Sequence, residues 1–271
     1  MNHFHGTPHD HLIQTTFRHL HHAASWLRWL LPGPLAARVD WTSGRLLSDR
    51  LRGSGQRYGI ADAVFEFRFL QGEFRLLIAF EHRSFQHAGL HDTLLRYSVY
   101  LTQTARRDRS APATAVLAVA LYHGHGNPVL QPQIVAAFPP EIGELLCSLQ
   151  PHLTVLLDDL TRCDEAQIRA RPLTALTTLT LLALRFLPRA DAAFTLEALD
   201  RWGPLLRAVD RDEGPPTGED AIATLGWYIL HVNETPIEEL HMALERNLQR
   251  PEGTTPPARR SCGSVASSAS P

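Results

Sequence analysis

Two acidic residues, Asp62 and Glu81, are the strongest candidates for chemistry in this sequence. Asp62 stands at the start of a run in which apolar and polar residues alternate, and Glu81 stands near the end of a second such run. Alternation with a period of two is typical of a β-strand, and Gln71-Gly72 between the runs fits a two-residue hairpin turn. Because residues equally distant from the turn face each other in a hairpin, we expect Asp62 to lie opposite Glu81.

The chemistry that this pair could support is metal-assisted hydrolysis. Directly opposed residues on a sheet have Cβ atoms about 5 Å apart, so two carboxylates there repel each other unless a positive charge lies between them. Mg²⁺ or Mn²⁺ would fill that role, because hard cations take carboxylate oxygens as ligands. Arg83 follows Glu81 by two residues and projects to the same face of the strand. A metal here could activate water, and the guanidinium could stabilise negative charge on a phosphate.

The polar residues also have plain structural interpretations, which the sequence leaves open. Asp62 and Glu81 could be ordinary charges on a solvated sheet face, with Arg83 pairing one of them. Asp10 is expected to be the N-cap of the helix that follows it, with a role at the metal site as the alternative. His123 is expected to be a hydrogen-bonded turn histidine at the end of a strand, with an approach to the site as the alternative.

The elements that would position the site predict an α/β fold. The second face of the hairpin is apolar and predicts the core, through Ala63, Phe65, Phe67 and Phe69 paired with Phe80, Ile78, Leu76 and Phe74. A strand is weakly indicated over 41–49, and the apolar run 116–122 is typical of a strand buried on both faces. Helical spacing of apolar residues predicts helices over 12–31 and 90–106. We therefore expect a central mixed sheet flanked by helices.

The second half of the chain predicts mainly helices. Helical patterns cover the ranges 140–149, 161–187, 195–209, 219–232 and 236–248. We expect four parts in the chain, namely a flexible arm over 1–11, a core over 12–130, a helical extension over 131–250 packed on that core, and a disordered tail rich in Ser, Pro and Gly over 251–271.

Composition and charge limit the class of protein and its partners. The chain has 271 residues, 44% of them hydrophobic, which excludes wholesale disorder. A formal net charge of −2 gives no whole-molecule attraction to nucleic acid, so DNA contact needs a local patch of arginines, since the chain has no lysine. No run approaches the roughly 20 apolar residues of a membrane span. With no signal-peptide pattern and only three scattered cysteines, we expect a cytoplasmic protein without membrane association.

Four residues on or beside the predicted helix 90–106 are candidates for DNA contact. Arg96 could contact a phosphate and Tyr97 could pack or hydrogen-bond beside it, while Arg106 and Arg107 could follow the phosphate backbone. The structural alternatives are an arginine stem lying along an amphipathic helix, a core tyrosine, and a solvated helix end favoured by the helix dipole.

An ordered set of short motifs adds a family resemblance. The motifs are Pro8-His9-Asp10 followed by Phe17, Asp62 within a strand, Glu81-His82-Arg83-Ser84, Arg96-Tyr97, and Tyr122-His123-Gly124. In this order, over residues 8–126, they resemble the YhgA-like putative transposases, also called recombination-promoting nucleases, of the PD-(D/E)XK nuclease superfamily. The resemblance implies a restriction-endonuclease-like core, double-stranded DNA as substrate, and a dependence on Mg²⁺ or Mn²⁺.

The resemblance also implies roles for individual residues. Asp62 and Glu81 match the two strand carboxylates of the superfamily, and the backbone carbonyl of His82 would complete the metal ligands. Arg83 departs from the pattern, because the superfamily has lysine there and this family often has glutamine. Arginine keeps a positive charge but cannot act as a general base, so the metal would have to lower the pKa of the attacking water.

The leading hypothesis is therefore a divalent-metal-dependent DNA endonuclease that acts in recombination or transposition. A second hypothesis is a catalytically degenerate nuclease fold that binds DNA or a protein partner without cleaving. Arg83 favours it, as does the absence of acidic residues from the predicted helix 12–31. A third is an interaction scaffold built on the helical second half. The sequence leaves the oligomeric state open, with a homo-oligomer among the options.

Overall fold

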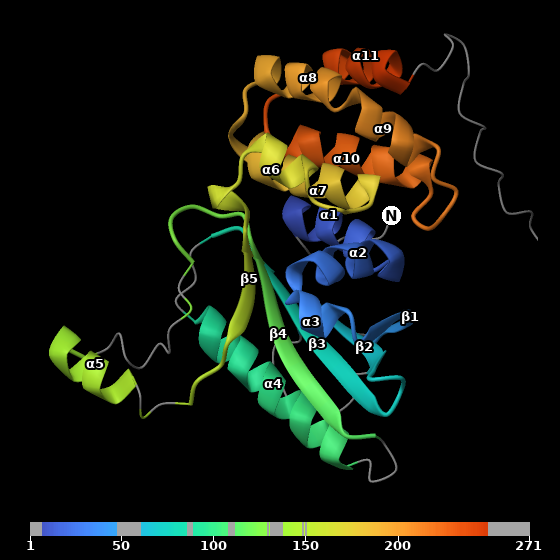
Figure 1. Ribbon diagram of the computed structural model, residues 1–271. Helices are drawn as coiled ribbons and strands as arrows, with labels where there is room; N and C mark the ends of the chain where they lie inside the picture. Colours follow the sequence, from blue (N-terminus) through green and yellow to red (C-terminus); the bar gives the residue numbers. More distant parts are fainter. Residues whose placement is uncertain are drawn as a thin grey trace, which may run out of the picture.

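The computed structural model contains a mixed five-stranded sheet with helices on both faces (Figure 1). It describes residues 7–47, 61–85, 89–107, 112–128, 130, 138–147, 149 and 151–248. The strand order follows the chain, with β1 (Val39–Leu46), β2 (Ala63–Phe69), β3 (Phe74–Arg83), β4 (Thr114–Tyr122) and β5 (Val155–Asp159). The first three strands are antiparallel neighbours, whereas β3, β4 and β5 pair in parallel. The expected α/β class, with a mixed sheet flanked by helices, is confirmed.

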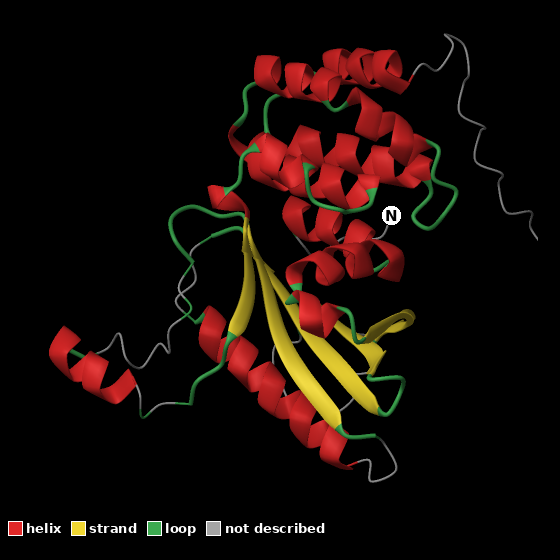
Figure 2. Cartoon of the chain, in the orientation of Figure 1, coloured by secondary structure: helices red, strands yellow, loops and turns green. Residues whose placement is uncertain are grey.

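The helices form unequal layers (Figures 1 and 2). On one face of the sheet, α4 (Leu90–Arg107) covers β3 and β4, as a crossover between parallel strands requires. The other face packs against α1 (Pro8–Phe17), α2 (Leu20–Leu30) and α3 (Gly33–Ala36). Behind these lie α6 (Glu165–Arg169), α7 (Ala175–Phe186), α8 (Ala192–Arg201), α9 (Gly203–Asp210), α10 (Gly218–Val232) and α11 (Ile237–Leu248), while α5 (Pro140–Cys147) projects away.

The hairpin has the predicted register but a longer turn. Ala63 pairs with Phe80 and Phe69 with Phe74, and most of the apolar face is buried in the main core as expected. Phe74 is the exception, because it follows the turn at the end of the sheet and is exposed. Four residues, rather than two, connect the strands, and Leu70, Gln71 and Gly72 all have positive φ angles. The longer loop adds two residues symmetrically about the same centre, so the faces of the strands are unchanged.

The N-terminal helical region differs from the sequence prediction at both its start and its middle. The helix begins at Pro8, so residues 7–11 are not part of a flexible arm, and residues 1–6 lie outside the described residues. The single helix expected over 12–31 is interrupted at Arg18 and His19, where His19 has an extended ψ of 111°. Both helices bury their apolar sides in the same core, so the helical spacing of apolar residues continues from one helix to the next and does not reveal the break.

The second half contains a strand that the sequence pattern did not reveal. β5 extends the sheet beyond the expected boundary at residue 130, because its short apolar run pairs in parallel with β4. The helical ranges 161–187 and 195–209 are each divided, near Pro172 and at Trp202 respectively, and Pro204 lies in the first turn of the helix that follows Trp202. The expected tail over 251–271 lies outside the described residues. No helix in the described part of the chain is long and apolar enough to span a membrane.

Candidate active site

The two candidate carboxylates lie at the same end of the hairpin. Asp62 is the residue before β2 and Glu81 lies near the end of β3, and the pairing of Ala63 with Phe80 brings their backbones side by side. Asp62 lies in a bend just outside the strand ladder. The Asp62 side chain is 30% exposed and that of Glu81 only 3%. The site therefore joins one accessible carboxylate to one that is almost fully removed from water.

Glu81 is a buried acid with an incomplete set of partners. Its Oε1 accepts a 2.6 Å contact from Arg83 Nη2, whereas its Oε2 is buried and has no hydrogen-bond partner among the described residues. Burial and the negative charge of Asp62 raise the pKa of Glu81 to about 8, against the opposing attraction of Arg83. A carboxyl in this state gains strongly from any cation that reaches it.

Asp62 is held by the residue that follows Glu81. The backbone N–H of His82 donates to Asp62 Oδ2 over 2.8 Å, and the His82 Nδ1 contacts the same oxygen over 2.6 Å. His82 Nε2 contacts Asp10 Oδ1 over 3.0 Å. Burial lowers the pKa of His82, but its hydrogen bonds to Asp10 and Asp62 outweigh burial and raise that pKa to about 9. The imidazole is therefore an imidazolium placed between two carboxylates.

Asp10 helps to cap α1, as expected, although from the third helical position rather than the N-cap, and it also belongs to the site. Thr7 is the N-cap of α1, and Asp10 is the third helical residue of a capping box. Its hydrogen bond with His82 is the main reason why the pKa of Asp10 falls to about 2. The sequence signal was the motif His9-Asp10, but nothing in its spacing indicated contact with the distant hairpin.

His123 also reaches the site rather than standing alone in a turn. Its ring lies parallel to that of His82, 6.1 Å between centroids, and edge-on to that of His9 at 4.8 Å. Its Nε2 is buried without a partner among the described residues. Burial, with the nearby charges of His9 and His82, lowers the pKa of His123 well below its ordinary value, so this ring is neutral at pH 7.

The residue after His123 must be glycine for the site to close. A Cβ on Gly124 would lie 2.7 Å from the backbone of both Ser84 and Phe85, which is closer than real contacts allow. The ends of β3 and β4 therefore approach each other more closely than any side chain permits. This explains physically why the motif Tyr122-His123-Gly124 ends in glycine.

The structure separates the four candidate DNA contacts. Tyr97 is half-buried near the carboxylates, and burial together with Glu81 and Asp62 raises the pKa of its hydroxyl. Arg96 is exposed and contacts Thr93 Oγ1 over 3.3 Å. Arg106 and Arg107 are exposed in the last turn of α4, about 15 Å farther along the helix axis than Arg96. They lie towards the start of β4, at the opposite end of the sheet from Glu81.

The available ligand atoms are of the type that a hard divalent cation prefers, although they are few in number. Asp62 and Glu81 offer carboxylate oxygens, and the buried Glu81 Oε2 lacks the partner that a cation would supply. Among the described residues, no group of three or more His, Cys, Asp or Glu side chains is arranged to hold a metal ion. The guanidinium of Arg83 contacts the other Glu81 oxygen, so a protein cation already shares this carboxylate.

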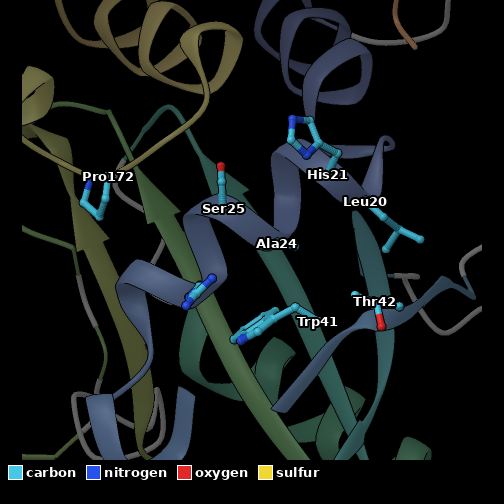
Figure 3. A pocket seen from close by; sticks show the side chains of 9 residues that line it. Leu20, His21, Ala24, Ser25, Trp41, Thr42 and Pro172 are labelled. Atoms are coloured by element: carbon cyan, nitrogen blue, oxygen red, sulfur yellow. The ribbon is translucent and has the colours of Figure 1, made fainter. Parts of the chain in front are cut away.

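A separate pocket of about 340 Å³ lies between α2 and β1 (Figure 3). Its lining is mixed, with Trp41 and Leu20 beside Arg28, His21 and Thr42. None of the carboxylate-bearing residues described above lines it. The candidate chemistry is therefore located at the strand ends rather than in this pocket.

Comparison with known proteins places the chain in a family. The family model described as "Putative transposase, YhgA-like" matches residues 7–211, which include the whole sheet and the first turn of α1. No curated protein and no solved structure gave a match. The matched segment is well over half of the 271 residues and contains Asp10, Asp62, Glu81 and His123. The chain therefore belongs to the family of YhgA-like putative transposases.

Proposed function

We propose that this protein is a divalent-metal-dependent endonuclease that hydrolyses phosphodiester bonds of double-stranded DNA in transposition or recombination. The observation that carries the proposal is the buried, unpartnered Oε2 of Glu81 beside the accessible carboxylate of Asp62. A buried acid with an unsatisfied oxygen is costly in free energy unless something binds it. Membership of the YhgA-like family supports the link to transposition.

The residues have distinct roles in this proposal. Asp62 and Glu81, with the backbone carbonyl of His82, would hold Mg²⁺ or Mn²⁺, which supplies Lewis-acid activation of the attacking water. Arg83, whose side chain is partly exposed at the same place, would stabilise the negative charge that develops on the phosphate. It stays protonated throughout and so moves no proton.

DNA would contact α4 outside the reacting centre. Arg96 lies exposed near the carboxylate end of the helix, where it could bind a phosphate next to the cleaved bond. Arg106 and Arg107 are too far along α4 for that phosphate and would contact the duplex backbone at a distance from it. Tyr97 is better placed to pack beside Glu81 than to reach DNA directly.

The proposal is tested by incubating supercoiled plasmid with the protein and Mg²⁺, Mn²⁺ or EDTA. We expect nicking or linearisation with either metal and none with EDTA. Asp62→Asn and Glu81→Gln should each lower the cleavage rate by at least about 100-fold, because each removes a charged metal ligand. Glu66→Gln is the matched control, since Glu66 lies on the same hairpin and pairs with Arg75 instead.

Cleavage that persists in EDTA, or in both carboxylate variants, would contradict this assignment. Thermal unfolding of each variant should accompany the assay. A variant that remains folded but inactive then reports on chemistry and not on stability.

DNA binding without cleavage is the second candidate function. The short contact between Arg83 and Glu81 favours it, because a guanidinium already neutralises the buried carboxylate without any metal. In that case the plasmid stays intact with either ion, while fluorescence anisotropy still detects duplex DNA binding. Absence of both activities would instead favour the interaction scaffold.

A further inference from the structure

Three side-chain contacts, joined through the backbone between His9 and Asp10, link the C-terminal helices to the Asp62 carboxylate. The Tyr228 hydroxyl on α10 is hydrogen-bonded to His9 Nδ1 over 3.1 Å. The next residue, Asp10, contacts His82 Nε2 over 3.0 Å, and His82 Nδ1 contacts Asp62 over 2.6 Å. These residues come from three regions that are far apart in the sequence.

Contacts with Thr7 hold the Asp10 side chain in the orientation in which it contacts His82. Its Oδ2 accepts a hydrogen bond from the backbone N–H of Thr7 over 2.6 Å, and its own N–H donates to Thr7 Oγ1 over 3.3 Å. The other oxygen, Oδ1, is the one that contacts His82. Because each carboxylate oxygen has its own partner, the side chain cannot rotate without losing one of them.

The His82 ring is fixed on its edges and on one face. Both ring nitrogens are engaged, Nε2 by Asp10 and Nδ1 by Asp62, so a ring flip breaks two charge-assisted contacts. The ring of His123 stacks parallel to it, with an interplanar angle of 8°. The side chain is only 7% exposed. His82 is therefore a rigid spacer between α1 and the end of the hairpin.

Asp62 takes its orientation from this spacer. Its Oδ2 receives both the backbone N–H and the ring Nδ1 of His82, whereas no described residue bonds to its Oδ1. Oδ2 is therefore engaged by the protein, and Oδ1 is available to a ligand. A rotation short of a full exchange of the two equivalent oxygens would break both contacts with His82.

The position of α1 is set in turn by the C-terminal helices. α1 packs against α10 and α7. His11 lies edge-on to Trp227 on α10, 4.9 Å between centroids, and Thr16 is hydrogen-bonded to Thr180 on α7 over 2.7 Å. A shift of these helices would therefore move Asp10 relative to the hairpin.

We propose that the imidazole of His82, as distinct from its backbone carbonyl, is a positioning group through which α10 and α1 fix the orientation of the Asp62 carboxylate for metal binding. This inference rests on the proposed function, because the orientation matters only where Asp62 holds a metal. Partners that orient a metal ligand without touching the metal typically contribute 10- to 100-fold to metal affinity. The proposal gives the helical second half of the chain a defined role at the site.

The test is the affinity for Mn²⁺ alone, measured by calorimetry or electron paramagnetic resonance on the full chain. Asp10→Ala should weaken Mn²⁺ binding by about 10-fold, and Tyr228→Phe by a smaller factor. Asp191→Ala is the matched control, because Asp191 caps α8 through its side chain without contacting the site. It should lower thermal stability in a similar way and leave Mn²⁺ affinity unchanged.

A pair of combined variants tests whether the effect passes through His82. Asparagine at position 82 keeps a donor near the place of Nδ1 but cannot reach Asp10. In the His82→Asn protein, Asp10→Ala should therefore cause no further loss of Mn²⁺ affinity. If Asp10 acted only through the stability of the fold, Asp10→Ala would lower the Mn²⁺ affinity of the His82→Asn protein as much as it lowers that of the wild type.

The outcomes separate this inference from the proposed function. Mn²⁺ binding that Asp62→Asn abolishes, combined with unchanged affinity in Tyr228→Phe and in any folded Asp10→Ala protein, overturns the positioning role and leaves the metal site intact. Wild-type protein that shows no Asp62-dependent Mn²⁺ binding overturns both. If Asp10→Ala does not fold, Tyr228→Phe decides, because it removes one buried hydroxyl and keeps the ring.

Discussion

Arg83 is the residue on which the two candidate functions differ. Its guanidinium contacts Glu81 over 2.6 Å, and its side chain is 25% exposed. Its Nε is buried without a hydrogen-bond partner among the described residues, so its contact with Glu81 leaves the guanidinium partly unsatisfied. In a nuclease this group is available to a phosphate, whereas in a binding protein it serves as a permanent counter-ion for the buried acid.

Replacement of Arg83 by glutamine separates these roles. If Arg83 stabilises charge on the phosphate, Arg83→Gln should lower metal-dependent plasmid cleavage by about 100-fold while Mn²⁺ binding is retained. Arg75→Gln is the control, because Arg75 lies on the same strand and pairs with Glu66 away from the site. Cleavage that rises in Arg83→Gln would show instead that the guanidinium blocks the site.

At the scale of elements, the site depends on how closely the ends of two parallel strands approach. β3 ends at Arg83 and β4 at Tyr122, and these two residues are paired in the parallel register. The His123 N–H donates to the Arg83 carbonyl over 3.1 Å, which continues the pairing past the end of β4. Gly124 then lies against the backbone of Ser84 and Phe85. This contact holds His123 against His82.

A methyl group at Gly124 should therefore disturb the site. Gly124→Ala places a Cβ 2.7 Å from backbone atoms that cannot rotate away, so the strand ends must separate. We expect a loss of about 1–3 kcal/mol in the free energy of unfolding, measured in urea, together with weaker Mn²⁺ binding. Gly33→Ala is the control, since a Cβ there meets nothing within 4 Å. Equal stability of the two variants would contradict the close-approach argument.

At the scale of the whole molecule, one hydrophobic core joins the sheet to the C-terminal helices. The same cluster contains Phe65 and Phe80 of the hairpin, Trp26 of α2, and Leu181 and Tyr228 of the C-terminal helices. The N-terminal helices lie between these two parts (Figure 1). Polar contacts also join the N-terminal helices to the C-terminal helices, for example His22 Nδ1 with Thr174 Oγ1 over 2.8 Å. The sheet and the helices should therefore unfold together.

His22 predicts a pH dependence of this shared stability. Burial, with the nearby charge of His21, lowers its pKa from 6.5 to about 4. Between these values the unfolded chain binds a proton that the folded protein does not, so stability is full above pH 6.5 and falls as the pH drops towards 4. The loss attributable to His22 is of the order of 2 kcal/mol.

Urea unfolding at pH 7.5 and pH 4.5 measures this effect. His22→Asn removes the titrating group and should reduce the loss of stability between the two pH values. His241→Asn is the control, because His241 is exposed on α11 and should keep the wild-type profile. A wild-type loss of stability that survives unchanged in His22→Asn would exclude this histidine as its source.

The hairpin could be predicted from the amino-acid pattern alone. The alternation from Ala63 to Phe69 and from Phe74 to Phe80 places Phe65, Phe67 and Phe80 on the buried face in only one register, and this holds even though the turn is longer than predicted. That register also brought Asp62 beside Glu81. The ordered motifs, which extend from His9 to Gly124, were enough to indicate the family.

The other residues that lie beside these carboxylates are known only from the packing of the folded chain. β5 was missed because a short apolar run has no period of its own, and only its pairing with β4 makes it a strand. The contacts of Asp10 and His123 with His82 could not be predicted, because local spacing carries no information about partners that lie many residues away. Their contacts with His82 form only when α1 and β4 pack against the end of the hairpin, and that packing depends on the core that all these elements share.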